Sequence, residues 1–138
     1  AQNERFALMR NYEEAIKKLD DARQKAGAAS TEAATRKEEA RREAESKLEA
    51  ARQAVTAAET ALASAPRGKG TQADIDAMTA DLEGVKAQLA EVESGIASQK
   101  YFEARDKADS IITSASNIST EIQTAIDTQK QMAQKRRN

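Results

Sequence analysis

Apolar residues recur at alternating steps of three and four along almost the whole chain, and this repeat is what most limits how the chain folds. Such spacing lines up apolar side chains on one face of an α-helix, as in coiled coils. Before residue 66 the series is Leu8, Tyr12, Ala15, Leu19, Ala22, Ala26, Ala29, Ala33, Arg36, Ala40, Ala44, Leu48, Ala51, Val55, Ala58, Leu62 and Ala65. After it the series is Ile75, Met78, Leu82, Val85, Leu89, Val92, Ile96, Ala104, Ala108, Ile111, Ala115, Ile118, Ile122, Ala125, Gln129 and Met132. We therefore predict an all-α protein.

The composition indicates a thin core within a single domain, residues 1–138. Charged residues make up 33% of the chain and most aliphatic residues are alanines, as in coiled coils and long helices. Alanine removes little apolar area from water, so each buried layer contributes little. We expect stability to come from many weak layers or from a partner.

The stretch "ASAPRGKGTQAD" contains the only proline of the chain, and Gly68 and Gly70 follow Pro66 closely. Such a cluster predicts a turn, after which Thr71 is a plausible N-cap with Asp74 as its capping-box partner. We predict a long antiparallel two-helix hairpin, coiled-coil-like, with a first arm at about 2–65, a tip loop at 66–71 and a second arm at about 72–136.

The repeat slips twice, between Ala40 and Leu48 and between Ile96 and Ala104. Extra four-residue steps of this kind are stutters, which locally unwind a coiled coil. If the arms fold back about residue 69, facing residue numbers add to roughly 138 and the two slips lie near each other. We expect two matched stutters, with Phe6, Met9 and Tyr12 beside Ile126, Gln129 and Met132 at the open end of the hairpin.

A compact four-helix bundle is the alternative architecture. Gly27 is a possible helix stop, with Ser30 and Thr31 as a restart, and Ser116 and Asn117 are possible caps in the second half. Breaks near Gly27 and Ser116 would give four helices.

Tyr101 and Phe102 are two of only four aromatic residues in the chain. In the hairpin register they face the small residues at 33–40, and large side chains opposite small ones fill a core efficiently. The favoured interpretation is that both rings are packing residues. Neighbouring residues point in different directions on a helix, however, so the alternative is that one ring reaches outward to contact a partner. We expect Phe102 to be buried, and Tyr101 to keep its hydroxyl in water and contact a partner.

We call the helix face that carries the apolar series the seam. Small residues gather beside the seam near the tip of the hairpin. Glycine inside a helix costs about 0.5 to 1 kcal/mol relative to alanine, so two glycines on one face point to a close helix contact. With Tyr101, these small residues are the candidate partner-binding positions: Ala50, Ala54, Ala57, Ala61, Ala77, Ala80, Gly84 and Gly95.

The residues available for chemistry are few. The chain has no Cys or His, and its 22 basic residues nearly balance its 23 acidic ones, giving a net charge of -1. "RGKGT" lacks the earlier glycine of a phosphate-binding loop and no strand precedes it. We expect no catalytic residue, cofactor, metal site or nucleic-acid partner.

The run Tyr-x-x-Ala-x-x-x-Ala, formed by Tyr101, Ala104 and Ala108, follows the helical stretch "DLEGVKAQLAEVESGIASQ". Over residues 75–115 the chain resembles a family of Ala-rich, all-helical bacterial envelope domains of unknown function. The resemblance implies an exported or lipid-anchored helical protein. Because the chain has no Cys to carry a lipid, an exported, periplasmic protein is the expectation.

Two functions fit these observations. The favoured one is a non-enzymatic helical scaffold or adaptor that self-associates or binds another helical protein. The alternative is an amphipathic protein that lays an apolar face on lipid or on a hydrophobic polymer, and membrane contact is the less favoured because alanine contributes little interfacial affinity.

Overall fold

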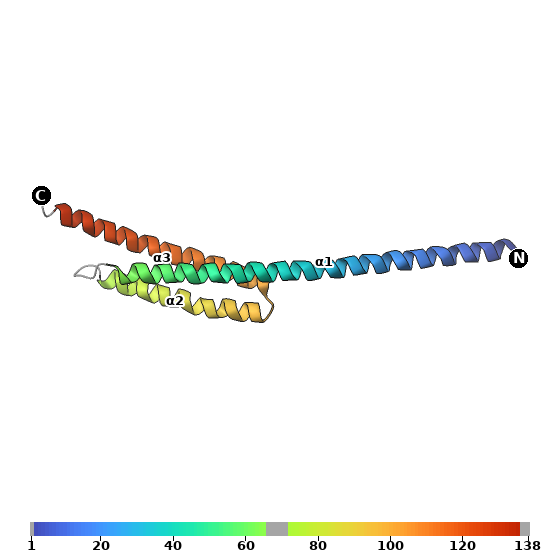
Figure 1. The fold of residues 1–138 in the computed structure, drawn as a ribbon, viewed down its shortest axis with the longest axis horizontal. Helices are drawn as coiled ribbons and strands as arrows, with labels where there is room; N and C mark the ends of the chain where they lie inside the picture. The colour runs from blue at the N-terminus through green and yellow to red at the C-terminus, as the bar shows by residue number, and fades with distance from the viewer. Residues whose placement is uncertain (1, 66–71, 136–138) are drawn as a thin grey trace. The chain divides into compact units, whose positions relative to one another are not determined.

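A computed structural model describes residues 2–65 and 72–135, with side chains at residue 6 and from residue 9 onwards in the first helix. The described residues form three helices: α1 (Gln2–Ala63), α2 (Gln72–Ala97) and α3 (Tyr101–Lys135) (Figure 1). The all-α class predicted from the apolar repeat is therefore confirmed. The predicted tip loop 66–71, including the N-cap Thr71, lies outside the described residues.

The chain divides into two units, Ala1–Glu39 and Ala40–Asn138. The first unit is the N-terminal part of α1, and its described side chains are almost all exposed. The second unit contains the rest of α1 together with α2 and α3. A hydrophobic core is present in the second unit.

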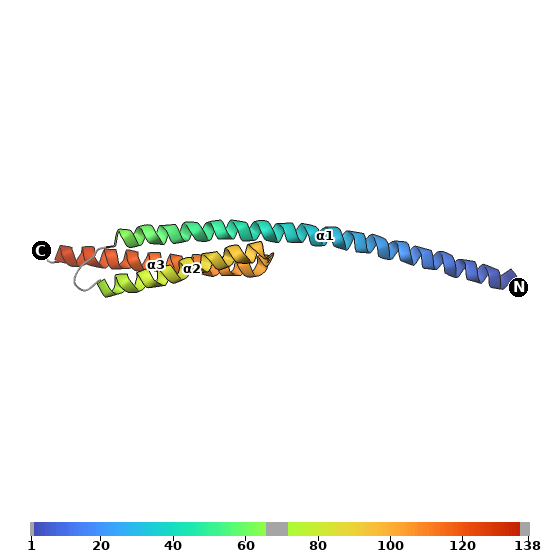
Figure 2. The same cartoon turned by 90° about the horizontal axis from the view of Figure 1, so that it is seen from below.

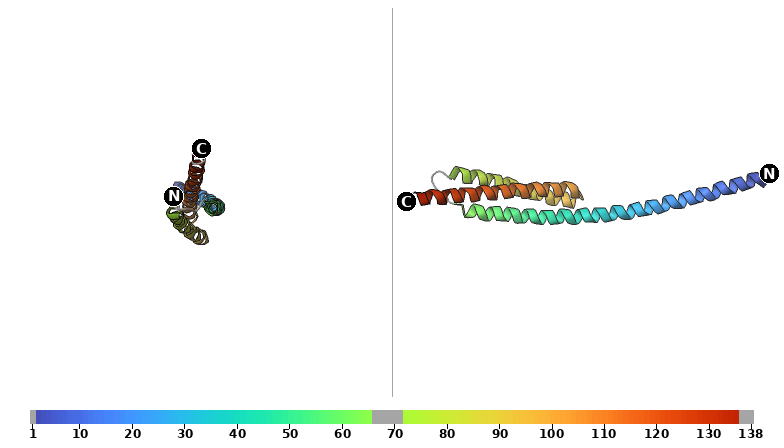
Figure 3. Two further views of the ribbon diagram at one scale, coloured as in Figure 1. Left: turned by 90° about the vertical axis from the view of Figure 1, so that its left-hand side faces the viewer. Right: turned by 90° about the horizontal axis from the view of Figure 1, so that it is seen from above.

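In the second unit α2 and α3 lie side by side along residues 40–63 of α1 (Figures 1 and 2). The views from below and from above show both helices on the same side of this part of α1 (Figure 2 and Figure 3, right). Within the described part of the chain, every buried hydrophobic residue belongs to the predicted apolar series: Ala40, Ala44, Leu48, Ala51, Val55, Ala58, Ile75, Leu82, Val85, Val92, Ala104, Ala108, Ile111, Ala115, Ile118 and Ile122. The repeat therefore identified the core-facing side of all three helices.

Ion pairs between helices show the directions in which they run. Arg52 pairs with Glu93 and Lys86 pairs with Glu59, so α2 is antiparallel to α1. Glu43 pairs with Arg105 and Lys47 with Asp109, each pair separated by 62 residues, so α3 is parallel to α1. Residues 40–135 form an up-down-up bundle of three helices.

The structure differs from the expected uninterrupted second arm. Residues 98–100 separate α2 from α3, within the slip that was expected to be a stutter. The described parts of α1 and α3 run without a break through Gly27 and Ser116, where the four-helix alternative placed its breaks. Thr31 donates a hydrogen bond to the Gly27 carbonyl and Thr120 to that of Ser116, so both hydroxyls bond within a continuous helix.

Backbone hydrogen bonds end α2 in the pattern of a Schellman motif. The Lys100 N–H donates to the Gly95 carbonyl at 2.9 Å, and the Gln99 N–H donates to the Ile96 carbonyl at 3.0 Å. The motif requires a residue in the left-handed conformation directly before Lys100, and Gln99 meets this requirement with a φ of 61°. Because glycine or asparagine usually occupies this position, the sequence did not signal the turn.

Candidate functional site

The predicted partner-binding alanines of α1 divide between two environments. Ala54 and Ala61 are half-buried and pack against the core of the bundle. Ala50 and Ala57 are exposed on the same helix. The α1 positions therefore do not form one continuous free face.

The α2 positions Ala77, Ala80 and Gly84 are all exposed. They follow the helical spacing of three and four, so they share one face. A Cβ atom added to Gly84 would have no atom within 4 Å. This face is made of small residues, and the intramolecular packing leaves it exposed.

Gly95 lies in close contact with another helix of the same chain. A Cβ atom placed on it would lie 3.2 Å from the Cβ of Ala104 and 3.7 Å from the Cα of the same residue. The missing side chain lets the end of α2 approach the first turn of α3. The close helix contact expected at this glycine is thus made within the chain.

The two adjacent rings at the start of α3 have exposures opposite to those expected. Phe102 is 63% exposed, whereas Tyr101 is half-buried and packs against the core. The guanidinium of Arg105 lies 5.5 Å from the centroid of the Phe102 ring, within the range of a cation–π interaction. The expectation of a buried Phe102 is wrong because α3 starts at residue 101 after a turn, which sets the directions of both rings independently of the hairpin register.

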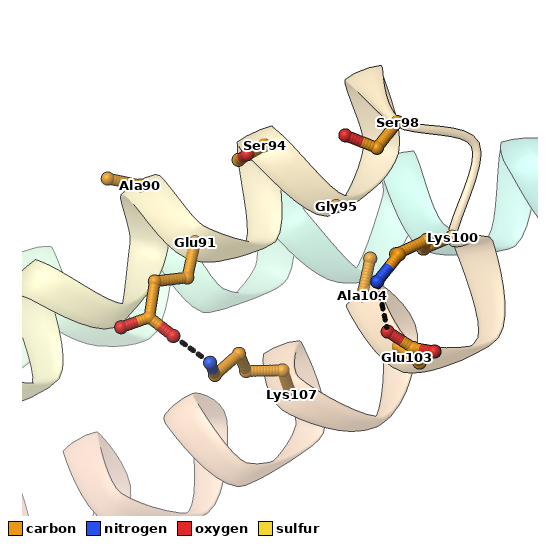
Figure 4. A pocket seen from close by; sticks show the side chains of 9 residues that line it. All are labelled: Ala90, Glu91, Ser94, Gly95, Ser98, Lys100, Glu103, Ala104 and Lys107. Atoms are coloured by element: carbon orange, nitrogen blue, oxygen red, sulfur yellow. Dashed lines mark hydrogen bonds and ion pairs between the residues drawn. The ribbon is translucent and has the colours of Figure 1, made fainter.

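An open groove of about 570 Å³ lies beside the α2–α3 turn (Figure 4). Across it Lys107 pairs with Glu91, and at its end Lys100 lies 3.5 Å from Glu103. Each charge thus faces an opposite charge of the protein rather than an open site. The lining residues are Ala90, Glu91, Ser94, Gly95, Ser98, Lys100, Glu103, Ala104 and Lys107.

Ion pairs along the bundle hold the register of its helices. Arg52 donates to Glu93 at 2.6 Å, and this hydrogen bond raises the pKa of Arg52. Lys86 lies 2.9 Å from Glu59, and its hydrogen bond to Glu59 raises the pKa of Lys86. These side chains are partly exposed, so their electrostatic contribution is screened by solvent. Their arrangement suits a structural role.

A further surface lies in the first unit and was not predicted as a site. We call it the N-terminal stripe, and its five residues are bulky, apolar and exposed by 68%, 67%, 69%, 44% and 69%: Phe6, Met9, Tyr12, Ile16 and Leu19. Phe6, Met9 and Tyr12 were expected to close the end of a hairpin. The signal that could have identified the stripe is that every later seam residue up to residue 40 is Ala or Arg.

No group of three or more acidic residues that could hold a metal ion occurs in residues 2–65 and 72–135. Within the same described part of the chain, no helix combines the length and apolar character needed to cross a membrane.

Comparison of the chain with models of protein families, with curated proteins and with solved structures gave no match.

Proposed function

We propose that this chain is a non-enzymatic helical scaffold or adaptor that self-associates or binds a helical partner. The observation that carries the proposal is the N-terminal stripe, whose five bulky side chains are exposed on α1. Single exposed apolar residues are common on proteins, but aligned groups mark interaction surfaces. The spacing of three and four in this stripe suits a second helix.

The bundle of residues 40–135 supports a scaffolding role. It contains the buried core, and its charged side chains lie outside that core in ion pairs such as Arg52 with Glu93. In its finer architecture, we propose that α1 and α2 act as an antiparallel helical hairpin that α3 completes. The exposed α2 face at Ala77, Ala80 and Gly84 is a secondary surface where another helix can approach closely.

The cellular setting is part of this proposal and rests on sequence resemblance. The likeness of residues 75–115 to envelope domains supports an exported protein in the periplasm or cell envelope. The net charge of -1 supports a protein partner over a nucleic acid, because it provides no general attraction to phosphate.

The alternative function is binding to lipid or to a hydrophobic polymer. The N-terminal stripe favours it more than the alanine-rich seam does, because Phe, Tyr and Leu contribute far more interfacial affinity than alanine. The charges beside the stripe cancel, however, because Arg10, Lys17 and Lys18 offset Glu13, Glu14 and Asp20, so they provide no electrostatic attraction to an anionic surface. We therefore retain lipid binding as the second candidate.

Sedimentation velocity and vesicle flotation distinguish the two functions. A double variant, Tyr12→Gln with Leu19→Gln, removes apolar area from the stripe. The matched control is Asp21→Gln, because Asp21 lies about 200° around the helix from Leu19. Self-association through the stripe predicts that the mass of wild type and control rises with concentration, whereas that of the double variant does not. It also predicts that none of the three proteins floats with vesicles. Flotation of monomeric wild type, lost in the double variant, would establish the alternative.

A further inference from the structure

We propose that the first unit of this protein binds the same segment of a second copy, in an antiparallel helix pair centred between residues 20 and 21. The inference rests on the proposed scaffold function and names its partner. The two observations behind it are the exposure of Tyr12, Ile16 and Leu19 and the order in which large and small residues occur along the seam.

The large side chains on the seam of this segment lie at one end of it. From residue 12 onwards its bulky members are Tyr12 and Leu19, whereas every seam position from Ala22 to Ala33 is alanine. All of these described residues are exposed. The half at residues 12–19 therefore exposes large apolar side chains to water. The half at residues 22–33 has room to accept such side chains from a partner.

An antiparallel pair matches these halves to each other. When facing residue numbers add to 41, Tyr12 lies opposite Ala29 of the other copy and Leu19 lies opposite Ala22. Each of these layers then contains one large and one small side chain, so two straight helices can stay at a constant distance. Only the layer of Ala15 and Ala26 has two small residues.

A parallel pair in register would not pack in this way. Tyr12 would face Tyr12 and Leu19 would face Leu19, while Ala22, Ala26 and Ala29 would face themselves. Wide and narrow layers would then follow one another, leaving voids around the alanines. The segment is thus self-complementary about a two-fold axis, which is the symmetry of the commonest homodimers.

The same seam continues along the sequence of α1 to Ala40, Ala44 and Leu48, which are buried against the other helices of the bundle. Where α2 and α3 lie beside α1, the seam residues of α1 therefore pack against other helices. An overlap of residues 8–33 would be about 39 Å long and would bury on the order of 1,000 Å² in total. This area corresponds to a weak, concentration-dependent dimer.

The charges beside the seam give the dimer a distinctive salt dependence. Lys18 and Lys25 occupy equivalent flanking positions, and the antiparallel register places Lys18 of one copy near Lys25 of the other. The ion pair of Lys18 with Glu14, at 2.8 Å on the same helix, offsets part of this repulsion. Added salt should therefore strengthen association at first by screening like charges.

Distances between spin labels test the direction of the pair. The chain has no Cys, so single-Cys variants of the full-length protein can be labelled cleanly at four exposed outer positions: Arg10, Lys17, Gln24 and Thr31. In the proposed register, equivalent labels are offset along the axis by about 32 Å at positions 10 and 31, but by about 10 Å at positions 17 and 24. Pulsed electron paramagnetic resonance should therefore give long distances at the outer two sites and shorter distances at the inner two.

Substitutions that add apolar area provide a second test. Ala29→Leu and Ala22→Leu should each weaken the dimer, because the new side chains would face Tyr12 and Leu19 and overpack their layers. A parallel pair or a lipid-bound helix would instead be strengthened by the added apolar area. Circular dichroism melting of each variant checks that the bundle of residues 40–135 is intact.

Each outcome bears on the inference. Long-short-short-long distances with weakening by Ala29→Leu support it. Four equal distances would overturn it but leave self-association, and hence the proposed function, in place. A monomer at every concentration would also overturn it, and the scaffold function would then require a different helical partner. A monomer whose stripe binds vesicles would overturn both.

Discussion

At the residue scale, the two glycines of α2 differ although the sequence presents them alike. A side chain on Gly95 would meet Ala104 at 3.2 Å, whereas one on Gly84 would meet open space. Helix propensity favours alanine over glycine by about 1 kcal/mol at both positions. The difference between them is therefore a difference in packing.

Gly84→Ala should raise the free energy of unfolding by about 0.5 to 1 kcal/mol, because it restricts the unfolded chain without a clash. Gly95→Val should lower it by about 1 to 3 kcal/mol, because the larger side chain forces α2 away from α3. Urea unfolding followed by circular dichroism measures both, with Gly84→Val as the control for β-branching. Equal effects of valine at the two positions would contradict the close contact at Gly95.

The rings at 101 and 102 allow a second comparison. Tyr101→Ala should lower the free energy of unfolding by about 2 kcal/mol, because a half-buried ring packed on the core is lost. Phe102→Ala should cost about 1 kcal/mol or less, mainly the cation–π contact with Arg105. Chemical denaturation of the two variants under identical conditions makes the comparison. A larger loss for Phe102→Ala would mean that the ring is buried in solution.

At the element scale, the turn between α2 and α3 depends on one left-handed residue. Gln99 holds a φ of 61°, a conformation that costs a residue with a Cβ atom roughly 1 to 2 kcal/mol. The Schellman hydrogen bonds and the contact between Gly95 and Ala104 hold it there.

Gln99→Gly should raise the free energy of unfolding by about 0.5 to 1 kcal/mol, since glycine adopts this φ without strain but gains entropy in the unfolded state. Gln99→Val should lower it by at least 1 kcal/mol, since β-branched residues rarely adopt positive φ. Thermal unfolding of the two variants measures the difference. Destabilisation by glycine would indicate that the Gln99 side chain contributes more than its backbone strain costs.

The stability of the contact between α1 and α2 should depend on pH through Lys86. Its pKa is raised above the ordinary 10.5 by the hydrogen bond to Glu59, so the pair contributes its full stabilisation below pH 10.5 and loses it as the pH rises through the folded-state pKa. Lys86→Gln should therefore melt at a lower temperature than wild type at pH 8, and the gap should close above the folded-state pKa. Lys130→Gln is a control outside the α1–α2 contact. A gap that does not change with pH would show that the lysine stem, rather than its charge, stabilises the bundle.

At the scale of the whole molecule, the two units of the chain differ in what stabilises them. The core begins at Ala40, and all buried hydrophobic residues of the described chain lie in Ala40–Asn138. In proteins most of the stability of a helix comes from the packing of its amphipathic face rather than from helix propensity. Association would supply the packing that the first unit does not find within its own residues.

Removal of residues 1–36 should therefore change the free energy of unfolding of the bundle by no more than about 0.5 kcal/mol, as for other changes away from a core. Differential scanning calorimetry of the truncated and full-length chains measures this difference. Sedimentation of the truncated chain should at the same time show a monomer. A large loss of stability on truncation would mean that the first unit contributes to the core of the second.

The apolar repeat determined much of this protein by itself. It identified the helical class and, from Ala40 to Ile122, every residue that the bundle buries. It did so because a helical period lines up side chains on one face whatever that face later contacts. Ala77, Ala80 and Gly84 are exposed, whereas Gly95, predicted to lie on the same face, packs against Ala104, and partner binding at these positions stays a prediction.

Only the tertiary structure decided where the second half of the chain reverses. The segment from Ile96 to Ala104 is compatible with two four-residue steps of one helix or with a turn between two helices, and the apolar pattern is the same in both cases. The turn is made by Gln99, a residue without a preference for positive φ, and is held by the contact of Gly95 with Ala104. That contact forms only when α3 folds back along α2. The direction of α3, the burial of Tyr101 and the exposure of Phe102 follow from this reversal and could not be read from the local sequence.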